Sequence, residues 1–133
     1  MNENDLKVNW YPGDTSLSCS EAVIRVALKK LKVESSDALK ISSALGGGVG
    51  GIGEICGAVT GAILAIGLRY GRDNETQPKD EVRNITKELL QEFRDEFGYL
   101  RCNDLIIGLD KEGKRKKCHE IAEFIGDKTL QRL

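Results

Sequence analysis

Residues 46–71 read GGGVGGIGEICGAVTGAILAIGLRYG, and this stretch decides the fold of the chain. From Ile55 to Leu68 it is apolar on almost every side of a helix and carries no charge. A helix of this kind is either buried in a protein core or spans a membrane. These fourteen residues fall short of the roughly 20 that a bilayer requires. We therefore predict a central, buried helix within residues 50–71 and no membrane span.

Residues 46–71 also contain ten of the chain's fifteen glycines. Gly53, Gly57 and Gly61 recur at every fourth position, so one face of the predicted helix lacks side chains. Each glycine in a helix interior costs about 1 kcal/mol relative to alanine. Three on one face therefore indicate a requirement of packing or of a binding site. Another helix of this chain, or a second copy of the chain, can approach this face backbone to backbone.

Helical periodicity and capping patterns predict further helices on both sides of this segment. Ser18 and Glu21 form a capping-box pattern at the start of the first one. No stretch alternates with the period of a strand, and no internal repeat occurs. The fold class is therefore all-α, a compact bundle of four to six helices around the glycine-rich helix. The further predicted helices span residues 19–32, 35–45, 78–97, 101–107 and 115–130, and a charged loop is predicted over residues 109–117. Residues 1–17 are predicted to form an irregular arm, and residues 18–133 a single helical domain.

The composition excludes several classes of function. Twenty basic and twenty-one acidic residues give a net charge of -1, so no overall field draws the chain to nucleic acid or to an anionic membrane. An aromatic content of 5% argues against a surface on which bases stack. Residues 1–13, MNENDLKVNWYPG, contain no apolar run of the kind found in a secretory signal. We therefore expect a cytoplasmic protein whose thiols stay reduced.

The four cysteines carry the chemistry that the sequence suggests. No CxxC motif occurs, which disfavours zinc knuckles and thioredoxin-type dithiols. Three of the cysteines lie near the start of a predicted helix, and Cys56 does so if residues 46–51 remain a loop. Partial positive charge and unpaired N–H groups at helix starts favour the thiolate. Metals and disulfide exchange both use thiolates; the alternative is that each cysteine is a small buried hydrophobe. The residues are Cys19, Cys56, Cys102 and Cys118, and the cations expected to act in the same direction are Arg101, Lys116 and Lys117.

The order of these motifs resembles a known family. Cys19-Ser-Glu-Ala-Val opens a helix, Cys56-Gly57-Ala58-Val59-Thr60-Gly61 and Gly67-Leu68-Arg69-Tyr70-Gly71 follow, and the single cysteines Cys102 and Cys118 come last. This arrangement is similar, over about residues 15–125, to the C-GCAxxG-C-C family of redox-active proteins, which is related to the split-Soret cytochromes. The resemblance implies a small helical redox protein whose four cysteines form one functional set, able to hold an iron–sulfur cluster.

Other motifs give weaker or negative predictions. Cys118-His119 matches the end of a CxxCH haem motif, but Arg115 stands where the first cysteine would be, so no covalent c-type haem is expected. His119 points about 100° away from Cys118 on a helix, which favours a surface or supporting position. The pattern GxGxxG over residues 48–53 follows a helical segment rather than a strand, so it does not indicate a dinucleotide site.

The basic run over residues 114–117 and the single acidic residue Glu54 each allow two interpretations. The basic run over residues 114–117 is expected to be a solvated loop, and a docking patch for an acidic redox partner is the less favoured alternative. Glu54 interrupts the apolar segment beside Cys56 and is either a buried proton acceptor or, as we favour, the solvent-facing start of the helix.

Three hypotheses for the function follow. In the first, Cys19, Cys56, Cys102 and Cys118 converge on a metal centre, with an iron–sulfur cluster favoured, and Gly57 and Gly61 let the backbone approach it. In the second, the same cysteines exchange disulfides without a metal, with Cys102 and Cys118 closing the shortest loop. In the third, the glycine face forms the contact of a dimeric interaction module. We expect a homodimer, a protein redox partner, and electron transfer rather than hydrolysis, since the chain has one histidine and no visible nucleophile–base pair.

Overall fold

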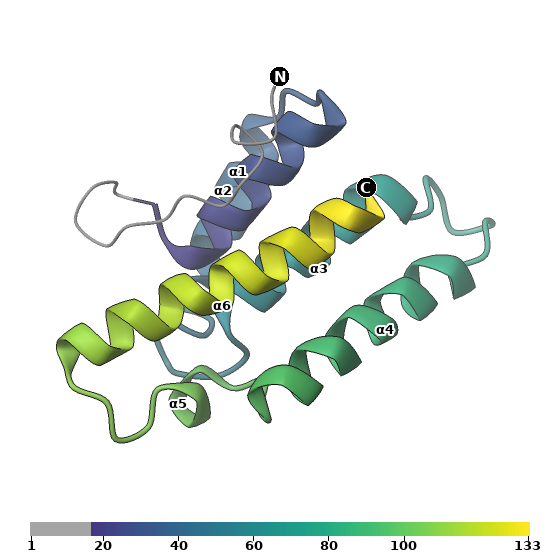
Figure 1. Cartoon of the computed structure of the whole chain (residues 1–133). Helices are drawn as coiled ribbons and strands as arrows, with labels where there is room; N and C mark the ends of the chain where they lie inside the picture. Colours follow the sequence, from purple (N-terminus) through teal and green to yellow (C-terminus); the bar gives the residue numbers. More distant parts are fainter. Residues whose placement is uncertain (1–16) are drawn as a thin grey trace.

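The computed structural model describes residues 17–133, so the predicted arm over 1–17 lies almost wholly outside the described residues. Within this range the chain is helical and contains no strand, which confirms the all-α class (Figure 1). The helices, in chain order, are α1 (Cys19–Leu31), α2 (Ser36–Ser42), the short 3-10 helix η2 (Ser43–Leu45), α3 (Gly57–Tyr70), α4 (Asp80–Phe97), α5 (Cys102–Leu105) and α6 (Lys111–Arg132).

Helix α3 is the centre of the molecule, as the apolar sequence predicts. Its residues Ala58, Val59, Ala62, Ala65 and Ile66 have no exposed surface. Helices α1, α4 and α6 all pack against it, and Figure 1 shows α4 and α6 running alongside it. None of the helices within residues 17–133 combines the length and the apolar character that a membrane span requires.

The start of α3 differs from the prediction. The helix begins at Gly57, and residues 47–51 instead form a turn in which every residue, Val49 included, has a positive φ. This turn is closed by backbone hydrogen bonds, among them Glu54 N–H to the Gly48 carbonyl at 2.9 Å. A Cβ on Gly48 would lie 2.7 Å from the Glu54 nitrogen, so the glycines serve a left-handed turn that side chains would obstruct. Gly53 belongs to this loop and not to the helix.

Gly57 and Gly61, the two glycines of the predicted glycine face that lie on α3, make room for α1. A Cβ added at Gly57 would come within 2.9 Å of the Cys19 sulfur, and one added at Gly61 within 2.6 Å of the Ser20 carbonyl oxygen. Ser20 is itself buried and donates its hydroxyl to the Ser42 carbonyl at 2.7 Å. The face of α3 that carries Gly57 and Gly61 therefore packs against α1 of the same chain. The homodimer remains a prediction, and its contact would have to form on another surface.

Helix α6 begins earlier than predicted. The Asp110 side chain accepts a hydrogen bond from the Gly113 N–H at 2.7 Å and caps a helix that starts at Lys111. The charged loop expected over 109–117 is therefore wrong from residue 111 onwards, because lysine, arginine and glutamate are good helix formers on an exposed face. As a result Cys118 lies well inside α6 and not in its first turn.

The remaining helices agree with the sequence to within a few residues. The predicted capping box at the start of α1 is present, and α4 begins shortly after Pro78 and ends at Gly98, which has a φ of 83°. Phe93 and Phe97 of α4 make edge-to-face contacts with Phe124 of α6, with ring centroids 6.4 and 5.3 Å from it. These contacts fix the end of α4 beside α6.

Replacing Gly61 by alanine tests the close approach of α1 and α3. We expect Gly61→Ala to lower the free energy of unfolding by about 1–3 kcal/mol, because the new methyl group meets backbone atoms that cannot rotate away. Gly67 lies on the same helix with open space around it, so Gly67→Ala is the matched control and should stabilise the protein by up to about 1 kcal/mol. Urea unfolding measures both values, and equal stabilisation by the two substitutions would contradict the packing described.

Candidate functional site: a cavity lined by four cysteines

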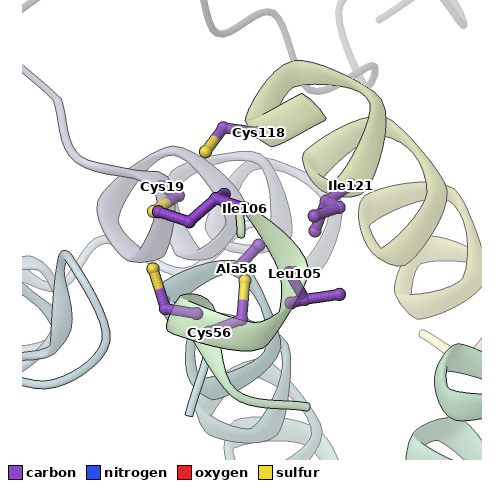
Figure 2. A pocket seen from close by; sticks show the side chains of 9 residues that line it. Cys19, Cys56, Ala58, Leu105, Ile106, Cys118 and Ile121 are labelled. Atoms are coloured by element: carbon purple, nitrogen blue, oxygen red, sulfur yellow. The ribbon is translucent and has the colours of Figure 1, made fainter. Parts of the chain in front are cut away.

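The four cysteines, although far apart in the sequence, line a single small cavity of about 20 Å³. All four are free thiols. Figure 2 shows the sulfurs of Cys19, Cys56 and Cys118 arranged around the side chain of Ile106. The lining is otherwise apolar or bare backbone: the cavity is lined by Cys19, Cys56, Gly57, Ala58, Cys102, Leu105, Ile106, Cys118 and Ile121.

The four sulfurs come from different positions on their helices. Cys19 is the first residue of α1, Cys56 precedes the first residue of α3, Cys102 is the first residue of α5, and Cys118 projects from the middle of α6. Gly57 lines the cavity beside Cys56, whereas Gly61 lies against Ser20 of α1. Of the two glycines predicted to approach a cofactor, the structure therefore places only Gly57 at the cavity.

An isolated antiparallel bridge holds Cys56 next to Cys102. It pairs Ile55 with Arg101. The Cys56 N–H donates to the Leu100 carbonyl at 2.8 Å, and the Cys102 N–H donates to the Glu54 carbonyl at 2.7 Å. Because these bonds involve only backbone atoms, they fix the two cysteine-bearing segments without any side chain. Sequence reasoning missed this bridge, since a single residue pair leaves no alternating pattern.

Glu54 takes part in the same junction from its outer side. Its carboxylate pairs with the Arg101 guanidinium at 3.2 Å, and both side chains are about half exposed. Such an ion pair contributes little to stability. Glu54 is therefore a solvent-facing residue next to the cavity, as favoured from the sequence, and not a buried proton acceptor.

The predicted preference for thiolates is wrong for Cys56, Cys102 and Cys118 in the metal-free protein. Burial raises the pKa of Cys56 to about 12 and that of Cys118 to about 11, and it also raises the pKa of Cys102. The charge of Cys19 acts in the same direction on all three. The N–H groups of Ala58 and Val59 lower the pKa of Cys56, but neither closes a capping hydrogen bond. Desolvation therefore outweighs the helix N-terminus, and these three thiols are protonated at neutral pH.

The cations expected to help are engaged elsewhere. Lys116 pairs with Glu112 at 3.7 Å, and the Lys117 ammonium lies 4.9 Å from the centre of the Phe97 ring. Lys114, which the sequence analysis did not single out for this role, is the residue whose charge lowers the pKa of Cys102. Because α6 begins at Lys111, the side chains of Lys114, Lys116 and Lys117 point in directions set by the helix and not by a loop.

The four sulfur atoms suit a soft metal centre, but their arrangement does not suit a single metal ion. Four thiol sulfurs in an apolar pocket are ligands typical of zinc and iron–sulfur sites. Within residues 17–133, however, no three His, Cys, Asp or Glu side chains are arranged to hold a single metal ion. A [4Fe–4S] cluster separates its ligands more widely than a single ion does, because each of the four thiolates binds a different iron. The space of about 20 Å³ has room for about one water molecule, so a cluster also requires lining side chains such as Ile106 to move outward.

Comparison with known proteins places the chain in a family. Residues 17–131 match the family described as "Putative redox-active protein (C_GCAxxG_C_C)". The chain belongs to this family. The match covers nearly all of the described residues and includes all four cysteines. No curated protein and no solved structure matches the chain.

The segment over residues 56–61 departs from the family pattern in one respect. It reads Cys56-Gly57-Ala58-Val59-Thr60-Gly61, so the first two letters stand in the reverse order to those in the family's name. In this chain the glycine occupies the first position of α3, where a side chain would meet the Cys19 sulfur. The cysteine stands one residue earlier and still lines the cavity.

The raised pKa values predict how stability depends on pH. The folded, metal-free protein holds the Cys56 and Cys118 protons more tightly than an unfolded chain with a thiol pKa of 9.0. The stability gained is fully present below about pH 9 and is lost as the pH rises towards 11 and 12. We expect urea unfolding of the reduced apoprotein to show a falling free energy from pH 9 to 10.5. Cys56→Ser should show a shallower fall, and an identical slope would contradict the burial of this thiol.

Proposed function

We propose that the chain is a small electron-transfer protein in which Cys19, Cys56, Cys102 and Cys118 together hold an iron–sulfur cluster. The observation that supports the proposal is the convergence of four thiols from four helices on one apolar cavity. Membership of a redox-active family agrees with it. When bound, such a cluster accepts and releases one electron at a time.

The chain contributes the environment of this centre. Ala58, Leu105 and Ile121 exclude water from the cavity, which keeps the dielectric low and influences the reduction potential. The N–H groups of Ala58 and Val59 favour negative charge on the Cys56 sulfur, and hydrogen bonds to ligand sulfurs are a known influence on the potential. The free thiols belong in a reducing compartment, and we propose the cytoplasm.

Loading requires the thiols to lose their protons. The raised pKa values keep Cys56 and Cys118 protonated in the empty protein, so binding of iron releases protons and is favoured by higher pH. The same values disfavour attack on a disulfide by Cys56 and Cys118, because the attacking species is a thiolate that is scarce at neutral pH. We favour the metal centre over disulfide exchange because four thiols line one cavity, whereas exchange requires only a pair of them.

Anaerobic purification tests the proposal directly. We expect brown protein containing iron and acid-labile sulfide. Cys56→Ser and Cys118→Ser should each lose most of both, since four thiolates complete the ligand set. Ile121→Val is the matched control, because it changes the cavity lining without removing a ligand, and it should retain the iron.

Colourless protein with four titratable thiols and no metal after anaerobic purification would overturn the metal centre. In that case mass spectrometry before and after mild oxidation examines the alternative. A decrease by two hydrogen masses for each pair of cysteines, reversed by a dithiol, would identify disulfide exchange. Unchanged mass and unreactive thiols would leave both redox functions without support.

A further inference from the structure

A basic surface with an apolar centre lies at the outer edge of the cysteine cavity. Leu105 and Ile106 line the cavity, and the chain then turns outward through Ile107 and Leu109 into α6. Ile107 is 77% exposed and Leu109 is 37% exposed. Large aliphatic side chains that are both exposed and adjacent to a functional cavity are typical of contact sites for another molecule.

Positive charge surrounds this apolar centre. Lys111, Lys114 and Arg115 are exposed on the first turns of α6, and none of them forms an ion pair with residues 17–133. Residues 101–117 contain six basic and three acidic residues in a chain whose net charge is -1. The rest of the chain is therefore acidic, and this segment carries a concentrated positive field.

The three acidic residues of the segment leave that field in place. Asp104 lies 3.8 Å from the Arg101 guanidinium, Asp110 caps α6 and Glu112 pairs with Lys116. Lys111, Lys114 and Arg115 precede Cys118 at helical spacing on α6, so they lie on the face of the helix that carries this cavity residue. Figure 1 shows α5 and the start of α6 together at the end of the molecule where α4 finishes, away from the first turns of α4 and from the C-terminus.

We propose that Ile107, Leu109, Lys111, Lys114 and Arg115, here named the basic rim, form the docking surface for an acidic one-electron carrier protein. The proposal rests on the proposed function and adds the class of partner. The basic field steers the acidic carrier to the cavity, and the aliphatic centre excludes water from the contact. The centre that Cys19, Cys56, Cys102 and Cys118 would hold would accept one electron from the reduced carrier, with no bond made or broken.

Charge reversal on the basic rim tests the proposal. The probes are flavodoxin as an acidic carrier and cytochrome c as a basic one. The variant is Lys114→Glu with Arg115→Glu, and the matched control is Arg83→Glu with Lys87→Glu, which makes the same changes on the exposed side of α4 near its start. Circular dichroism checks that both variants keep their helices.

We expect the wild-type protein to exchange electrons faster with flavodoxin than with cytochrome c, at a rate that falls as salt is added. The rim variant should lose about tenfold or more of the flavodoxin rate at low ionic strength, and the control should keep it. Equal losses in both variants, or no loss in either, would overturn the proposal. So would a preference of the wild-type protein for cytochrome c, or rim-dependent binding to vesicles of anionic phospholipid in place of flavodoxin.

Binding measured without electron transfer separates this proposal from the proposed function. Calorimetric titration of the purified chain with flavodoxin reports docking whether or not iron is bound. Binding that disappears in the rim variant, in a protein without iron, would retain the docking surface and reject the metal centre. An iron-containing protein that transfers electrons at the same rate in all variants would retain the metal centre and reject the docking surface.

Discussion

The close approach of α1 to α3 is the contact on which the site depends. Gly57 and Gly61 leave no side chain between the two helices, so the Cys19 sulfur and the Ser20 backbone lie directly against α3. This contact brings the first cysteine to the second, across a long stretch of chain. The cost in helix propensity, about 1 kcal/mol for each glycine, is offset by packing that a larger residue would prevent.

Two backbone devices complete the arrangement. A left-handed turn over residues 47–51 precedes α3, and the bridge between Ile55 and Arg101 joins the second cysteine segment to the third. Both use main-chain hydrogen bonds, so the cavity walls hold their places independently of side-chain rotamers. The fourth cysteine arrives on α6, which packs against both α1 and α3.

Burial gives the cavity its chemical character. Helix N-termini favour thiolates, yet desolvation is the larger effect here and raises the pKa of Cys56 and Cys118. Formation of a thiolate in this site therefore costs free energy, whether the thiolate attacks a disulfide or binds a metal. The exposed positive charges of Lys111, Lys114 and Arg115 lie outside the cavity, on the first turns of α6.

The sequence by itself determined the helical class, the central position of α3, most helix boundaries and the family, because periodicity and capping are local signals that act over a few residues. It also identified all four cysteines. Only the tertiary structure decided that they share a cavity, that their pKa values rise, and that Gly61 serves helix packing. Burial and contacts between distant segments depend on the whole assembly, so Cys118 has the same neighbours in sequence whether it starts a helix or, as here, faces a cavity from the middle of one.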